Sequence, residues 1–149
     1  MKNLIFLLFL FLSFFSSFSQ IPTKLSTKDK VMKVFQKKFG NLTLVKQGKY
    51  FEVNIYQMEN GNNLAIVRSS SQDLQIADDK ARMIFMNFLV TNEESGLTKQ
   101  TNIKGCFPDE KFYQENEKGY IMYQVYLLEE GKILLNDAPL DINLYLTKK

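Results

Sequence analysis

Apolar residues recur at helical spacing between Ser26 and Gly40, where five of them fall on one arc of a helix. Ser26 with Asp29 resembles the residue pair that caps a helix start, and a glycine such as Gly40 commonly follows a helix end. The pattern therefore predicts a short amphipathic helix. Its polar face carries three lysines: Lys30, Lys33 and Lys37.

A second helical pattern covers residues 72–90, with Ser70 and Asp73 as its predicted cap. The stripe expected to face a core consists of Leu74, Ala77, Ala81, Ile84, Phe85, Phe88 and Leu89. A second apolar stripe on the far side consists of Ile76, Met83, Met86 and Val90. A surface helix normally has one stripe, so something is expected to cover the second. Either the segment that follows the helix covers it, or a protein partner or lipid-like ligand does.

Alternating apolar and polar residues predict the strands of a sheet. The predicted strands cover residues 42–45, 50–58, 64–69, 120–128 and 140–146. Asn60-Gly61 is typical of a hairpin turn. Because the strand over 120–128 is apolar on both faces, we expect it in the middle of the sheet.

Residues 91–118 give weaker signals because they are mostly polar. Within them we predict an edge strand over 97–103 and a short helical turn at 108–110. Together the patterns predict an α+β fold: an antiparallel sheet of about four to five strands, with the long helix packed across it and the shorter N-terminal helix at its edge.

Residues 1–19 have the pattern of a secretory signal peptide: an early lysine, a run of about a dozen apolar residues and a small-x-small site at 17–19. The apolar run is too short to span a bilayer, which takes roughly 20 residues. We therefore expect cleavage near Gln20 and export to a periplasm or the medium. Residues 20–149 should form one domain with no transmembrane helix.

The residue types present exclude several chemistries. The chain has no histidine and a single cysteine, Cys106, which removes Ser-His-Asp and Cys-His catalysis and the usual zinc sites. Cys106 is expected to be either a buried thiol or an intermolecular crosslink. The adjacent carboxylates Asp78 and Asp79 would point about 100° apart on a helix and cannot act as a catalytic pair. We therefore predict no enzyme, no cofactor and no metal site.

Charge is unevenly distributed along the sequence. Residues 20–49 contain eight lysines and one aspartate, whereas residues 50–149 contain ten basic and fifteen acidic residues. The basic segment suggests an anionic envelope component or membrane surface as a partner, bound by Lys30, Lys33 and Lys37. Nucleic acid is not expected, because aromatic residues are not interleaved with the lysines in any recognisable module. A small ligand bound by an aromatic sheet face is a further alternative, resting on Tyr50, Tyr56, Tyr120, Tyr123 and Tyr126.

The run AIVRSSSQDLQIADDKARMIFMNFL over 65–89, followed by GYIMYQVYLLEEGK, resembles the LPP20-like domain of bacterial envelope proteins. The resemblance covers about residues 50–130 and includes Leu74, Ala77 and Ala81, whose small or apolar side chains let a helix lie close to a sheet. It implies an α+β envelope domain without established catalysis. The expected function is thus a non-catalytic exported interaction module, with Ile76, Met83, Met86 and Val90 as its partner-binding residues.

Overall fold

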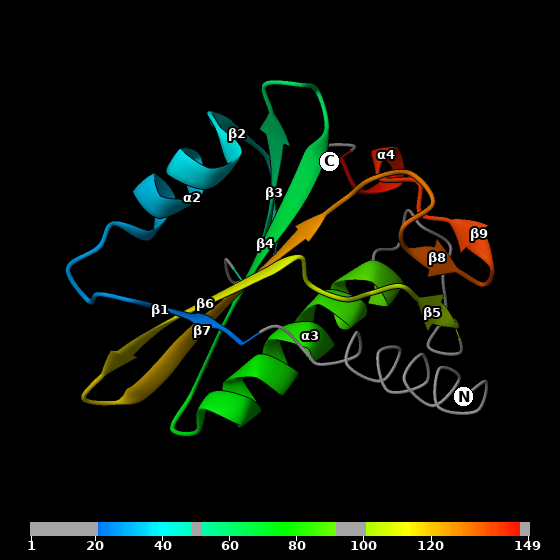
Figure 1. Ribbon diagram of the computed structural model, residues 1–149. Helices are drawn as coiled ribbons and strands as arrows, with labels where there is room; N and C mark the ends of the chain where they lie inside the picture. Colours follow the sequence, from blue (N-terminus) through cyan, green and yellow to red (C-terminus); the bar gives the residue numbers. More distant parts are fainter. Residues whose placement is uncertain (1–20, 49–51, 92–100, 147–149) are drawn as a thin grey trace, which may run out of the picture.

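The computed structural model describes residues 21–48, 52–91 and 101–146 of the chain, which form an α+β fold (Figure 1). The strands are β1 (Thr23–Leu25), β2 (Leu42–Gln47), β3 (Val53–Met58), β4 (Asn63–Ser71), β5 (Ile103–Lys104), β6 (Glu110–Asn116), β7 (Gly119–Leu127), β8 (Leu134–Leu135) and β9 (Ala138–Pro139). The helices are α2 (Val31–Phe39), α3 (Leu74–Thr91) and α4 (Asn143–Leu146).

The main sheet has six strands in the order β1-β6-β7-β4-β3-β2. β1 runs parallel to β6, and the other neighbours are antiparallel. The predicted antiparallel sheet of four to five strands was therefore wrong in strand number and in direction at one edge. The sequence did not predict β1 because that strand is only three residues long. It did not predict β6 because the sequence of this strand, EKFYQEN, is mostly polar.

Two predictions within this sheet are confirmed. The predicted hairpin around Asn60-Gly61 is the antiparallel pair β3–β4, and Gly61 adopts a positive φ of 84° in the turn. β7 lies between β6 and β4, in the middle of the sheet, as its two apolar faces indicate.

The two longer helices cover opposite faces of the main sheet (Figure 1). On one face, α3 packs against alternate residues of β3, β4 and β7, such as Ile55, Val67 and Met122, in what we call the α3-side core. On the other face, Phe35 of α2 packs against Phe112 and Tyr123 in what we call the α2-side core. The Phe35 ring centroid lies 5.4 Å from that of Phe112 and 5.9 Å from that of Tyr123. The expected position of the N-terminal helix at the sheet edge was thus wrong, because its apolar arc needs a broad apolar surface to cover.

Both predicted helix caps were wrong by a few residues. Ser26 and Asp29 do bond to each other, the Ser26 N–H donating to the Asp29 carboxylate at 2.9 Å, but they form a separate turn, and α2 follows Lys30. At α3, the strand β4 continues through Ser71, and it is Asp73 whose carboxylate accepts the Ile76 N–H at 2.9 Å. The C-terminal end of α2 at Gly40, with φ of 80°, is confirmed.

The last predicted strand, 140–146, was wrong, because α4 occupies its second half. Ile142, Tyr145 and Leu146 have the i, i+3, i+4 spacing of one helix face, and all three belong to or contact the α3-side core. The predicted helical turn at 108–110 was wrong too, since Glu110 already begins β6. Of the predicted strand over 97–103, residues 97–100 lie outside the described residues, and Ile103 belongs to β5 in a small sheet ordered β5-β8-β9.

Candidate functional site

The structure separates the four residues of the predicted second stripe of α3. Ile76 and Met83 are 58% and 63% exposed, and their spacing of seven residues places them on one side of the helix. Met86 and Val90 are half-buried, and Met86 packs against the α3-side core. Part of the segment expected to cover the stripe, residues 92–100, lies outside the described residues. The structure thus brings two of the four predicted residues together on an exposed surface.

Close packing of the opposite side of α3 fixes which residues face outward. Ala77 and Ala81 are fully buried, and their small side chains let the helix lie near the sheet. The Ser69 hydroxyl donates a hydrogen bond to the Ala77 carbonyl at 2.5 Å. The ring centroids of Phe85 and Tyr126 lie 4.2 Å apart. These contacts hold the helix in one rotation about its axis.

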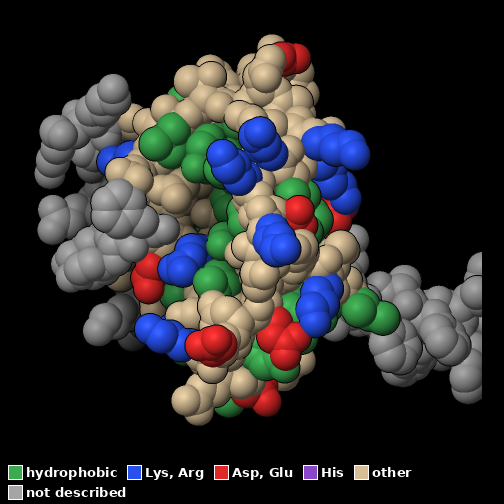
Figure 2. All heavy atoms as spheres, turned by 90° about the vertical axis from the view of Figure 1, so that its left-hand side faces the viewer, with side chains coloured by type: hydrophobic (Ala, Val, Ile, Leu, Met, Phe, Trp, Pro, Cys, Tyr) green, Lys and Arg blue, Asp and Glu red, His purple; other side chains and the backbone are tan. Residues whose placement is uncertain are grey.

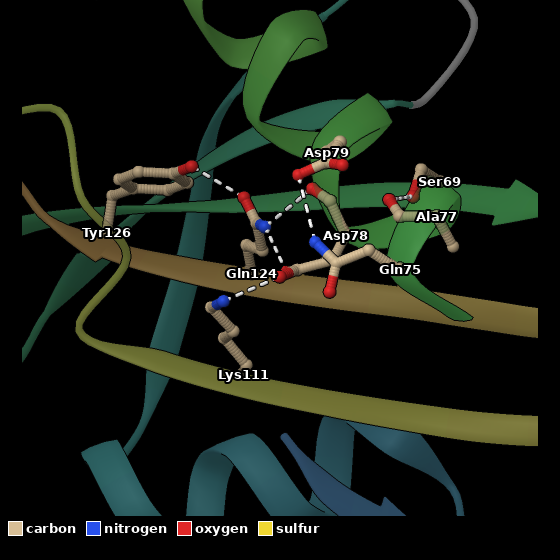
Figure 3. Close-up of polar contacts among 8 residues, drawn as sticks. All are labelled: Ser69, Gln75, Ala77, Asp78, Asp79, Lys111, Gln124 and Tyr126. Carbon is tan, nitrogen blue, oxygen red and sulfur yellow. Dashed lines mark hydrogen bonds and ion pairs between the residues drawn. The ribbon is translucent and has the colours of Figure 1, made fainter. Parts of the chain in front are cut away.

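A polar network under the edge of α3 adds a second fixed point (Figure 3). The Lys111 ammonium lies 2.6 Å from the Asp78 carboxylate, and these side chains are 8% and 14% exposed. Gln124 donates to the Asp78 carboxylate at 2.6 Å and to the Asp78 carbonyl at 2.9 Å. The Tyr126 hydroxyl donates to the Gln124 side chain at 2.5 Å. The network joins β6, β7 and α3 through satisfied hydrogen bonds.

Burial favours the neutral forms of two side chains near this ion pair, Tyr126 and Cys106. Burial raises the pKa of the Tyr126 hydroxyl far above its ordinary range, and nearby carboxylates add to the effect. Burial also raises the pKa of the Cys106 thiol to about 11, opposed by the Arg82 guanidinium. Cys106 is buried, which agrees with the first of its two expected roles. Neither group is ionised near neutral pH, so the network anchors the helix and offers no activated nucleophile.

Phe107 is a further exposed apolar residue next to α3, and no signal in the sequence points to it. Its side chain is 61% exposed, and the Arg82 guanidinium lies over its ring, 4.6 Å from the centroid. The aromatic ring thus lies beside α3 at the position of Arg82. A single phenylalanine between Cys106 and Pro108 carries no periodic pattern that could reveal it.

The three predicted anion-binding lysines lie on the outward side of α2, with Lys33 and Lys37 opposite the buried Phe35 and Lys30 at the N-cap position. All three are exposed: Lys30, Lys33 and Lys37. None of them forms an ion pair with another described residue, whereas their neighbour Lys38 pairs with Glu110 at 2.7 Å. Figure 2 shows this side of the molecule, where Lys and Arg side chains are spread over the surface with Asp and Glu side chains among them.

The tyrosines predicted to form an aromatic sheet face are divided between the two faces. Tyr56 and Tyr123 contact the α2-side core, and Tyr126 belongs to the α3-side core. Tyr120 lies against Tyr113, with ring centroids 6.0 Å apart. Tyr50 lies outside the described residues. No single aromatic surface results from those tyrosines that the structure describes.

Within the three described ranges, no group of three His, Cys, Asp or Glu side chains is placed to hold a metal ion. A search of the same ranges finds no helix with the length and apolar character needed to cross a membrane.

The chain matches no family model, no curated protein and no solved structure. The resemblance of residues 50–130 to the LPP20-like domain stays a prediction.

Proposed function

We propose that this chain is an exported, non-catalytic interaction protein that binds a protein partner through the outer side of α3. We call this surface the α3 docking face and define it by Ile76 and Met83. The observation that carries the proposal is that two large apolar side chains on one side of one helix each expose more than half of their surface.

The polar surroundings of these residues fit a transient contact. Asp79 and Lys80 are exposed on the helix turn between Ile76 and Met83, so the face mixes apolar and charged groups. Such mixing is ordinary for non-obligate interfaces, which are no more apolar than the rest of a protein surface. The methionine adapts to partners of varied shape, because its unbranched side chain has three rotatable bonds. Export is supported by the signal-peptide pattern of residues 1–19 and by the LPP20-like resemblance.

A photo-crosslinking experiment tests this function. A photoreactive phenylalanine analogue replaces Met83 in cells that express the full chain, and a matched chain carries it at the exposed Gln36 of α2. We expect one abundant crosslinked protein from position 83 and none from position 36. The substitution Met83→Asp should abolish capture of that protein by a tagged chain, with unchanged circular dichroism and melting temperature. Unfolding of Met83→Asp, or equal capture by Gln36→Asp and Met83→Asp, would show that α3 is not the interface.

A second candidate function is binding to an anionic surface through α2. The observation that favours it is the absence of ion-pair partners, among the described residues, for Lys30, Lys33 and Lys37. Attraction by exposed charges is screened over about 8 Å at physiological salt, so binding should weaken steeply as salt rises.

Vesicles that contain phosphatidylglycerol test this candidate by co-sedimentation. We expect the variant with Gln at positions 30, 33 and 37 to lose most of its binding, and a control with Gln at positions 24, 80 and 104 to keep it, although both variants have the same net charge. Equal losses in both variants would mean that net charge alone attracts the vesicles and would refute a site on α2.

A further inference from the structure

An open pocket of about 300 Å³ is lined by residues of β4, of the turn into α3 and of the β6–β7 hairpin. Figure 1 shows these segments at one end of the sheet. The register places these segments side by side, with Ser71 opposite Tyr120. The polar residues and the tyrosine of its lining include Arg68, Ser70, Gln72, Asn116, Lys118 and Tyr120. None of them belongs to the α3 docking face or to the lysines of α2.

Two cations in this pocket have no acidic partner in the described part of the chain. Neither Arg68 nor Lys118 forms an ion pair there, although both side chains are exposed. Glu115, on the same hairpin, is neutralised by Lys24, whose ammonium lies 2.6 Å from the Glu115 carboxylate. The Glu52 backbone carbonyl accepts a hydrogen bond from the Arg68 backbone N–H at 2.7 Å, and the Glu52 carboxylate takes no part in this bond. Arg68 and Lys118 can therefore each pair with an anion bound in the pocket, in competition with Glu117 beside Lys118 on the hairpin.

Neutral hydrogen-bonding groups surround the two cations. In the described structure no hydrogen bond occupies the side chains of Ser70 and Gln72. The Asn116 side-chain oxygen accepts the Lys118 backbone N–H at 2.8 Å, which fixes the turn and leaves the Asn116 amide N–H groups available. Hydroxyl and amide groups of this kind can donate to, and accept from, the hydroxyl groups of a ligand.

We propose that this pocket binds an acidic monosaccharide unit through its carboxylate and its hydroxyl groups. The Arg68 guanidinium presents the planar fork that fits a carboxylate with two parallel hydrogen bonds, and Lys118 supplies a second positive charge. Ser70, Gln72 and Asn116 then face the ring hydroxyls. A pocket of about 300 Å³ lies at the small end of the usual range of ligand sites, which fits one sugar residue.

Titration of the isotope-labelled full protein with glucuronate, followed by amide chemical shifts, tests the proposal. We expect saturable shifts at Arg68, Ser70 and Lys118, smaller shifts with inorganic phosphate and none with glucose. Arg68→Gln should weaken glucuronate binding roughly tenfold, the usual effect of losing one charge-assisted hydrogen bond. Lys104→Gln removes the same charge from β5, outside the pocket, and should leave the affinity unchanged.

Three outcomes would overturn the proposal. Equal weakening by Arg68→Gln and Lys104→Gln would assign the binding to net charge. Phosphate that binds as tightly as glucuronate would show a simple anion site without sugar recognition, and glucose that binds as tightly would remove the role of the carboxylate. The titration uses no partner of α3, so its failure leaves the proposed docking function standing, and the reverse also holds.

Discussion

Lys111 and Gln124 occupy sheet positions that are normally apolar, and both are held by Asp78 of α3. Lys111 is 7% exposed and Gln124 1% exposed. A buried polar group is costly unless its hydrogen-bonding capacity is used, and here the Asp78 carboxylate serves both residues. At the residue scale, therefore, the Asp78 carboxylate of α3 satisfies one buried polar side chain in each of two neighbouring strands, β6 and β7.

The substitution Asp78→Ala should lower the free energy of unfolding by about 3 kcal/mol, because the Lys111 ammonium would lose its partner in a nearly buried position. Urea denaturation measures the change. Asp79→Ala is the matched control, since Asp79 is exposed and its carboxylate accepts a hydrogen bond only from Gln75 among the described residues. It should change the stability by less than about 0.5 kcal/mol. A similar small loss in both variants would show that the buried pair does not anchor the helix.

The junction between β4, α3 and the β6–β7 hairpin depends on close backbone approach. Gly119 has a φ of 122°, and a Cβ at this position would lie 2.4 Å from the Ser71 carbonyl oxygen. Only glycine therefore lets the hairpin lie against the end of β4. The same approach brings Lys118 and Asn116 to Arg68 and so builds the pocket proposed for the acidic sugar.

Gly119→Ala should destabilise the protein by at least about 2 kcal/mol, because strain from a positive φ adds to a steric clash. Gly61→Ala provides the comparison, since Gly61 also has a positive φ, 84°, but a Cβ at that position would meet no other atom within 4 Å. It should cost about 1 kcal/mol, the strain term alone. Thermal unfolding of both variants separates the two effects. Equal losses would mean that the backbone at Ser71 moves aside freely.

At the scale of the whole molecule, the described residues form three layers, with the main sheet between α2 and α3. β4 and β7 contribute alternate residues to both cores: Leu64 and Val125 to the α2-side core, Val67 and Met122 to the α3-side core. Because the same two strands belong to both cores, each core is held in place by the other. We therefore expect the layers to unfold together.

Phe35→Ala should lower the global free energy of unfolding by about 3 kcal/mol, as for other large-to-small substitutions in a core. Phe35 is 1% exposed and lies in the α2-side core. Amide hydrogen exchange should show the loss of protection in β4, β7 and α3 as well as in α2. Loss of protection confined to α2 would contradict a single cooperative unit.

The sequence by itself determined the elements whose pattern comes from local spacing. The core stripe of α3, the β3–β4 hairpin and the central position of β7 follow from the 3.6-residue and two-residue periods of apolar side chains. Gly40 marked the end of α2 for a local reason as well, since its positive φ suits a residue without a Cβ. The exposure of Lys33 and Lys37 likewise follows from their position opposite Phe35.

Only the tertiary structure decided the features that depend on partners distant in the sequence. β6 needs Asp78 to satisfy Lys111, and Gln114 donates to the Ser26 carbonyl at 3.0 Å, so its polar sequence could not indicate a strand. The four residues of the second stripe of α3 differ in exposure because Met86 packs against the α3-side core, whereas Met83 is 63% exposed. The pocket at Arg68 and Lys118 joins segments about fifty residues apart, a proximity set by strand register, which no local pattern encodes.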